Sequence, residues 1–228
     1  MDSFLKVLLT YAKEPIAILD GSIPWSEYIP LDLSTSNAEI ELLDITHPVT
    51  CQDYIHRVLK RSSGRIAYGG YLEKRNLYAD KASFSDNLSQ QRNIHLGIDY
   101  WSEAGTSVLV PLAGTVHSFK NNSTIGDYGP TIILEHQLHG HTFYTLYGHL
   151  SLESLEGLYV GKQFKACTVL AKLGTPDINV NYAPHLHFQI IRDMQGNMGD
   201  YPGVAKTLDL DYYKENCPDP DILLKIAS

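Results

Sequence analysis

Three short motifs place histidine and aspartate side chains at spacings that suit metal-assisted chemistry. They are HLGID, with His95 and Asp99, YGHLS, with His149, and HLH, with His185 and His187. Two histidines and one carboxylate form a known ligand set for catalytic zinc, which keeps a position open for water. Zinc lowers the pKa of that water and polarises a carbonyl group, and nearby histidines can take up and deliver protons. The residue types therefore suit metal-assisted hydrolysis.

The spacing within each motif decides whether its side chains can meet at one site. In a strand, residues i and i+2 face the same side about 6.6 Å apart, so His185 and His187 can project side by side. One of them can bind a metal ion while the other stands near the metal-bound water. His95 and Asp99 would lie about 13 Å apart on a straight strand, which is too far for one ion. Gly97 permits a bend or bulge between them that brings both side chains in.

Each motif also has an ordinary structural explanation. An isolated HxH in a strand is usually a surface or core feature, and an isolated HxxxD is weaker evidence still. The stretch EHQLHGHTF lies between two strand-like runs, with Gly140 suited to a hairpin turn. We interpret its three histidines as loop or rim residues: His136, His139 and His141. Three further histidines are most simply structural: His47, His56 and His117. Spacing alone does not select a site from ten histidines and twenty-six acidic residues.

The elements that must position these motifs change character along the chain. Residues 3–13 and 50–64 are predicted to be helical, the second helix capped by Thr50 and ended by Gly64. Residues 14–50 are rich in proline, serine and acidic residues and are predicted to be irregular, with short strands. From residue 65, short β-branched or aromatic runs broken by glycine, proline or asparagine predict an all-β sandwich or barrel. The tail ENCPDPDILLKI predicts a turn and a short packed segment.

Composition narrows the function classes. The chain has 228 residues, is 43% hydrophobic and carries a net charge of −8. The acidic charge argues against a nucleic-acid binder and against tight electrostatic docking on an anionic cell wall or membrane. Three cysteines without a CxxC motif argue against a disulfide framework and favour a reducing compartment.

The N-terminal stretch MDSFLKVLLTYAKEP bears on location. Its apolar run is short and interrupted by Lys6, and an acidic residue stands where a signal peptide needs positive charge. We therefore interpret it as a short amphipathic helix, and no stretch of the sequence is long and apolar enough to span a bilayer. A cytoplasmic location is expected, with non-classical export left open.

The motifs taken in order resemble those of the lysostaphin/LytM-type zinc metallopeptidases, the peptidoglycan endopeptidases. The resemblance covers roughly residues 92–191 and rests on HLGIDYWSEAGTSVLVPLAGTV, YTLYGHLS, VGKQF, LAKLG and APHLHFQI. It implies a compact antiparallel β-sheet groove. It also implies that His95, Asp99 and His187 bind Zn²⁺ and that His149 and His185 act in catalysis. The substrate implied is a peptide or peptidoglycan-like chain containing Gly or D-Ala.

A second resemblance, to a narrower group of proteins, extends over residues 29–225. IPLDLS, DYGPTIILEH, FYTLYGHLSLESLEGLYVG, DYPGVA and CPDPDILL are similar to the peptidase-like module of large fusion proteins. In those fusions the module lies between an aminoglycoside-phosphotransferase-like kinase and a class III aminotransferase. Exported wall hydrolases normally carry a signal and often a wall-binding module, neither of which the sequence displays. The fusions look cytosolic, so this kinship would account for that departure.

These observations lead to one expected organisation and three functional hypotheses. We expect a mainly β fold with a small N-terminal α/β elaboration over residues 1–64 and a zinc metallopeptidase domain with a C-terminal extension over residues 65–228. The first hypothesis is a zinc metalloendopeptidase acting on a peptidoglycan-type amide. The second is a cytosolic zinc amidohydrolase acting on a small metabolite, and the third is a zinc-containing binding module without turnover. Neither a nucleic-acid nor a membrane partner is expected, and the question of protein partners is left open.

Overall fold

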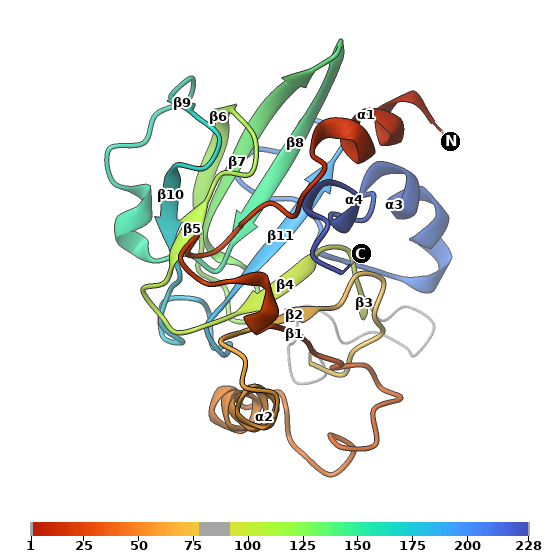
Figure 1. Cartoon of the computed structure of the whole chain (residues 1–228), viewed down its shortest axis with the longest axis vertical. Helices are drawn as coiled ribbons and strands as arrows, with labels where there is room; N and C mark the ends of the chain where they lie inside the picture. The colour runs from red at the N-terminus through yellow and green to blue at the C-terminus, as the bar shows by residue number, and fades with distance from the viewer. Residues whose placement is uncertain (1, 78–91, 228) are drawn as a thin grey trace.

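The fold is built on one large β-sheet, shown in a computed structural model that describes residues 2–77 and 92–227 (Figure 1). Within these residues eight strands form the sheet, in the order β1-β2-β4-β11-β8-β7-β6-β9. Neighbouring strands are antiparallel except β1 and β2, which run parallel. The bounds, in the same order, are Tyr28–Pro30, Ile66–Gly69, Ile98–Trp101, His185–Ile191, His141–Gly148, Gly129–Leu138, Gly114–Asn122 and Gln163–Phe164. The predicted mainly β, antiparallel fold is confirmed.

Two smaller antiparallel sheets complete the β structure of the described residues. Strand β5 (Ser107–Leu109) pairs with β10 (Val169–Lys172), and β3 (Ile94–His95) pairs with β12 (Val204–Ala205). The β3–β12 pair matters for the site, because β3 carries the first residue of HLGID. Short 3₁₀ turns in the described residues are Trp25–Glu27, Leu152–Leu155 and Thr207–Asp209.

The helices lie at the periphery of the sheet. Helix α1 (Ser3–Tyr11) buries Phe4 and Leu8, as an amphipathic segment should, and Asp2 caps it. It lies with α3 (Leu210–Asn216) and α4 (Asp221–Leu224) on one side of the molecule, while α2 (Pro48–Arg61) lies beyond β1 (Figure 1). The predicted packed segment of the tail is α4, whose two leucines are buried. None of the helices in residues 2–77 and 92–227 is long and apolar enough to cross a membrane.

The predicted ends of the second helix are wrong. Helix α2 begins at Pro48, after His47 in the N-cap position, so Thr50 lies inside the first turn and is not the cap. Proline suits that place because it has no N–H to satisfy and its φ is already helical. The helix ends at Arg61, and Ser63 takes the left-handed conformation, with φ of 54°, that was expected of Gly64.

The N-terminal residues pack on the same sheet as the motifs. Strand β1 adds an edge strand to β2, and Leu31 donates its N–H to the carbonyl of Tyr68. Ile55 and Val58 of helix α2 belong to one buried hydrophobic cluster with Trp101 of β4. The division of the chain at residue 64 stays a prediction, but residues before it contact the strand that carries Asp99.

The β7–β8 hairpin corrects one interpretation of the histidines. His139 and Gly140 form its turn with φ of 48° and 83°, the double positive φ of a type I′ turn, so the turn predicted at Gly140 is confirmed. His136 is not a loop or rim residue, because it lies within β7 and is buried. Its Nδ1 donates to the carbonyl of Ala113, and its Nε2 accepts from the hydroxyl of Thr145. Both ring nitrogens are satisfied, which allows a histidine to be buried in the sheet.

Candidate metal centre and active site

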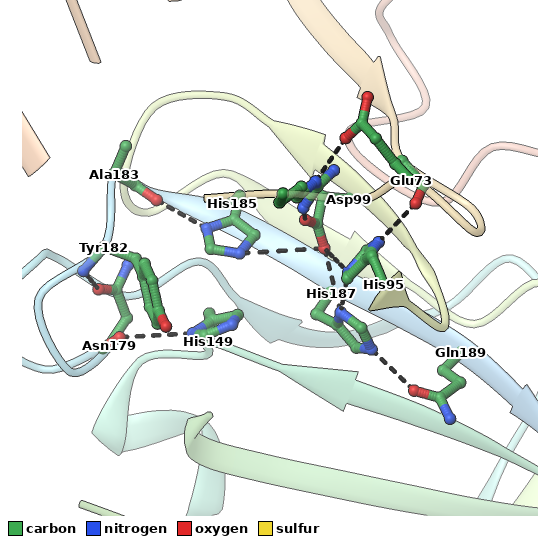
Figure 2. A network of polar contacts seen from close by, with 12 residues as sticks. Glu73, His95, Asp99, His149, Asn179, Tyr182, Ala183, His185, His187 and Gln189 are labelled. Atoms are coloured by element: carbon green, nitrogen blue, oxygen red, sulfur yellow. Dashed lines mark hydrogen bonds and ion pairs between the residues drawn. The ribbon is translucent and has the colours of Figure 1, made fainter. Parts of the chain in front are cut away.

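Four strands bring the five predicted residues to one place (Figure 2). His95 lies on β3, Asp99 on β4, and His185 and His187 on β11, while His149 directly follows β8. Strand β11 runs between β4 and β8, and its register sets His187 opposite Asp99 on one side and next to the end of β8 on the other. Residues separated by almost a hundred positions in sequence therefore meet through strand pairing.

The turn within HLGID brings its two ends together. The chain leaves β3 after His95 and enters β4 at Ile98, so His95 Nε2 lies 3.2 Å from Asp99 Oδ1. A Cβ at Gly97 would lie 2.8 Å from the ring of His187, so this position accommodates no side chain without displacing that ring. The bend predicted at Gly97 is confirmed, and the glycine also makes room for the third residue of the cluster.

Three side-chain atoms converge on one point. His95 Nε2 lies 2.8 Å from His187 Nδ1, and Asp99 Oδ1 lies 3.1 Å from the same His187 nitrogen. The potential ligand atoms of these three buried residues all lie within 4.8 Å of one another. Tetrahedral zinc, with bonds of about 2.0–2.2 Å, separates its ligand atoms by about 3.3 Å. The donor set and its spacing therefore fit a zinc ion after small outward movements.

The hydrogen bonds behind the two histidines direct their lone pairs inward. His95 Nδ1 lies 3.0 Å from the carbonyl oxygen of Gly70, so it carries the proton and Nε2 is left as a lone pair. His187 Nε2 lies 2.9 Å from Gln189 Oε1. The amide nitrogen of Gln189 donates to the carbonyl of Pro202, 3.1 Å away, which fixes the amide orientation. His187 therefore donates through Nε2 and presents Nδ1 to the cluster.

Asp99 presents a charged oxygen to these lone pairs. Burial alone would raise the pKa of its carboxyl group, but His95 and the guanidinium of Arg75 hold that pKa well below its usual range. Arg75 Nη1 donates to Oδ2 at 2.5 Å, so Oδ1 is the oxygen that faces the two histidines. Two neutral nitrogens and one carboxylate oxygen are thus arranged around a common centre.

His185 stands beside the cluster without belonging to it. Its Nε2 is 4.0 Å from Asp99 Oδ1, while its Nδ1 lies 2.7 Å from the carbonyl oxygen of Ala183 and donates to it. The Nε2 lone pair therefore faces the cluster. Its ring also stacks against Trp101, with centroids 5.7 Å apart. The HLH motif thus gives one imidazole to the cluster and holds the other next to it.

His149, which directly follows the neighbouring strand β8, completes the group. Its ring centroid is 4.1 Å from that of His185, and its Nδ1 is 3.4 Å from the carbonyl oxygen of Asn179. Its backbone has a φ of 62°, a conformation that few non-glycine residues adopt and that often marks a functional position. Tyr182 packs edge-on against both histidines, with centroid distances of 5.2 Å to His149 and 5.9 Å to His185.

Burial keeps His95, His149 and His185 neutral. It lowers the pKa of His95 to about 4 and lowers the pKa of His185. Burial, followed by the nearby rings of His185 and His187, lowers the pKa of His149 well below its usual value. Neutral imidazoles can bind a metal ion or accept a proton at pH 7, whereas imidazolium can do neither.

The five residues line a cavity of about 290 Å³. Its wall also includes Tyr128, whose ring centroid lies 5.1 Å from that of His187 and 5.8 Å from that of His149. Tyr128 and Tyr182 were not singled out from the sequence, because tyrosines are frequent in this chain and neither lies in a motif with ligand spacing. In the described part of the chain, the six other histidines do not line this cavity.

Comparison with known proteins finds a family match for the segment that carries this site. Residues 93–199 match peptidase family M23. This part of the chain is an M23 peptidase domain. It contains HLGID, YGHLS and HLH, so all five predicted residues fall within the M23 domain. Residues 93–199 are therefore similar to hydrolases of the lysostaphin/LytM type. No curated protein matches the chain, and the narrower kinship with fusion-protein modules stays a prediction.

Several solved structures are similar to parts of the chain. The catalytic domain of the antimicrobial peptidase lysostaphin from Staphylococcus simulans is 22% identical over 54% of this chain and 80% of its own, with a TM-score of 0.38. A mutant catalytic domain of the prophage-encoded M23 protein EnpA from Enterococcus faecalis is 20% identical over 50% of this chain and 81% of its own, with a TM-score of 0.38. A zinc-containing peptidase from Vibrio cholerae is 22% identical over 46% of this chain and 29% of its own, with a TM-score of 0.36.

Proposed function

We propose that the chain is a zinc-dependent metallopeptidase that hydrolyses a peptide amide bond. The observation that carries the proposal is the convergence of His95 Nε2, His187 Nδ1 and Asp99 Oδ1 in a cavity that two further neutral histidines also line. In this proposal the three converging residues hold the zinc ion. A zinc ion bound there would polarise the scissile carbonyl and lower the pKa of a bound water molecule.

His149 and His185 would then move protons and stabilise charge. The carbonyl of Ala183 holds the proton of His185 on Nδ1, which leaves Nε2 able to accept a proton from the attacking water. His149 stands across from it, and once it has received a proton it can donate a hydrogen bond to the developing oxyanion or pass that proton to the leaving amine. Their low pKa favours prompt release of any proton they accept, so the pair can pass the water proton on to the leaving group.

A binding module without turnover has less support. A structural zinc site needs its ligands and the hydrogen bonds that orient them, but it has no need for two extra neutral histidines in the same cavity. The strained backbone of His149 argues in the same direction, since a residue needed only for packing could be replaced by one without that strain.

The substrate we propose is a cell-wall-type peptide containing Gly or D-Ala, cut within the chain. The M23 family match and the ordered motifs support this choice. The net charge of −8 supports the second candidate, a zinc amidohydrolase acting on a small metabolite, because an acidic protein is repelled by an anionic wall. Both candidates use the same five residues, so only the substrate distinguishes them.

The experiment that tests the proposal incubates zinc-loaded protein with purified peptidoglycan and, separately, with short Gly- and D-Ala-containing peptides and small amides. His149→Ala is the matched control, because it should keep the metal and lose turnover. Release of muropeptides by the wild type alone would support the wall substrate. Cleavage of small amides without muropeptides would replace it with the second candidate. Failure of the zinc-loaded wild type to cleave any of these substrates would overturn the peptidase proposal.

A further inference from the structure

We propose that Arg75 is a positioning residue that holds Asp99 in its ligand geometry. Through this arginine the N-terminal segment, which precedes residue 65, supports the metal site. The inference rests on the proposed zinc site. It concerns residues that precede the M23 domain, which begins at residue 93. It therefore assigns a role to a part of the chain that the family match does not cover.

The guanidinium of Arg75 is held at three points. Its side chain is fully buried, and Nη1 donates to Asp99 Oδ2 at 2.5 Å. Nε donates to Glu73 Oε2, also at 2.5 Å. The flat guanidinium lies 5.5 Å from the ring centroid of Trp101. A planar group fixed by two carboxylates and an aromatic ring has one orientation, and arginine supplies that fork where lysine would supply a single point charge.

The hydrogen bond from Arg75 determines which oxygen of Asp99 faces the cluster. With Oδ2 engaged by Arg75, Oδ1 is the atom that lies 3.2 Å from His95 Nε2 and 3.1 Å from His187 Nδ1. Without the guanidinium, the carboxylate could rotate about χ2 or present both oxygens to a metal ion. We infer that Arg75 restricts Asp99 to single-oxygen ligation.

Arg75 belongs to a turn that supports two residues of the cluster at once. The carbonyl of Gly70 accepts from His95 Nδ1, and Arg75, five residues later, holds Asp99. A Cβ at Gly70 would lie 1.9 Å from Nη2 of Arg75, and its φ is +106°, so the turn is shaped around the guanidinium. The backbone of Glu73 accepts the N–H of His95, which ties the turn to β3.

The N-terminal segment is attached to this turn through Glu73. The N–H of Leu33 donates to Glu73 Oε1 at 3.0 Å, while Oε2 of the same carboxylate accepts from Arg75. A continuous series of hydrogen bonds thus runs from Leu33 through Glu73 and Arg75 to Asp99. A buried arginine is costly unless it is paired, and here both of its partners are buried or nearly buried carboxylates. Such an arrangement is expected where orientation is needed near a functional group.

The test compares R75K and R75M with the wild type in zinc binding, measured by competition with a chromophoric chelator, and in the visible spectrum of Co²⁺-loaded protein. We expect both variants to bind zinc about 10- to 100-fold more weakly, the usual effect of removing a partner of a ligand. We also expect the Co²⁺ bands to change in shape, because Asp99 gains freedom. R65K is the matched control, since Arg65 pairs with Glu27 at the surface and should leave both measurements unchanged.

The thermal midpoint of each metal-free variant separates loss of positioning from loss of fold. If R75M fails to fold, R75K decides the matter. Lysine keeps the positive charge but lacks the guanidinium that binds both Asp99 and Glu73. Wild-type zinc affinity and an unchanged Co²⁺ spectrum in R75K would overturn the proposal. A wild type that binds zinc but cleaves no substrate would overturn the peptidase function and leave this test intact. A wild type that binds no zinc would overturn both.

Discussion

Two groups of histidines in this molecule look alike in sequence and differ in what their ring nitrogens contact. The site group comprises His95, His149, His185 and His187, and the hairpin group comprises His136, His139 and His141. Burial does not distinguish His95 of the site group from His136 of the hairpin group, because each is 1% exposed. Charge does not distinguish them either, since burial lowers the pKa of both His95 and His136 to about 4.

The direction of the unused nitrogens does distinguish the groups. His136 has both nitrogens taken, one by a carbonyl and one by the Thr145 hydroxyl, so it has nothing to offer a ligand. In the site group, carbonyl or amide oxygens occupy one nitrogen of His95, His185 and His187, and the other nitrogen faces the cluster. A buried histidine is therefore a functional candidate when one nitrogen is held by an acceptor and the other points into a cavity.

The largest effect is expected from removing a member of the converging set. His187→Ala takes away one of three ligand atoms and opens a space beside Gly97, so we expect zinc content to fall from about one ion per chain to a small fraction of that. Hydrolysis should fall with the metal. Elemental analysis after gel filtration measures the first result, and a His187→Ala protein that retains a full equivalent of zinc would remove this residue from the ligand set.

A smaller effect on activity, with no effect on metal, is expected from the two flanking histidines. His149→Ala and His185→Ala leave all three converging atoms in place, so zinc content should be near that of the wild type. Hydrolysis should fall roughly 100-fold or more, the scale of losing a positioned acid–base or oxyanion partner. Loss of zinc in His185→Ala, with zinc retained in His187→Ala, would reverse the two assignments within HLH.

The buried hairpin histidine should affect stability and its pH dependence, and not the metal. Folded His136 has a pKa of about 4 against an ordinary value of 6.5, so below pH 6.5 the unfolded chain gains a proton that the folded chain does not. The stability it contributes is full above that pH and falls by roughly 1.4 kcal/mol per unit on acidification. Glutamine has no ionisable group, so the stability of His136→Gln should not fall in this way.

The measurement is urea denaturation of the metal-free proteins at two pH values, one above 6.5 and one between 4 and 6.5. At the higher pH, His136→Gln should be less stable than the wild type by about 1–3 kcal/mol, because a buried hydrogen-bond partner is left imperfectly paired. At the lower pH that deficit should shrink. A deficit that stays constant or grows on acidification would show that His136 is not held neutral in the folded protein.

The smallest effects are expected at the hairpin turn. His139 is exposed and has a left-handed backbone conformation that asparagine also tolerates. The ring centroid of His141 lies 5.7 Å from that of Phe4. His139→Asn and His141→Ala should change the free energy of unfolding by no more than about 0.5 kcal/mol. Zinc content and hydrolysis should equal those of the wild type. A loss of zinc in either variant would move the hairpin into the metal site.

Much of the fold was predictable because its signals are local. The β runs from residue 65 onwards, the turn at Gly140 and the bend at Gly97 follow from residue type and alternation. The choice of site residues among ten histidines depended on the ordered motifs of a family, since HxH and HxxxD occur by chance. His136 was misplaced because its two hydrogen-bond partners, Ala113 and Thr145, belong to neighbouring parts of the sheet and are not visible in the local pattern.

The residues that sequence reasoning missed act through long-range pairing. Arg75 reaches Asp99 across 24 positions, and Gln189 is held by Pro202 and by the thiol of Cys217. Tyr128 contacts the histidines only because β7 and β8 pair in their observed register. Each of these contacts depends on the folded sheet, so no local pattern in the sequence points to them.

The most direct test of the central claim is the nitrogen NMR spectrum of the histidine side chains while metal-free protein is titrated with zinc. The hydrogen bonds of His95 and His187 predict opposite binding atoms, Nε2 in the first and Nδ1 in the second. We expect these two nitrogens to shift together and to saturate at about one equivalent of zinc, as a three-ligand catalytic site requires. Saturation without a shift of either nitrogen, or with shifts confined to the hairpin histidines, would contradict the proposed metal centre.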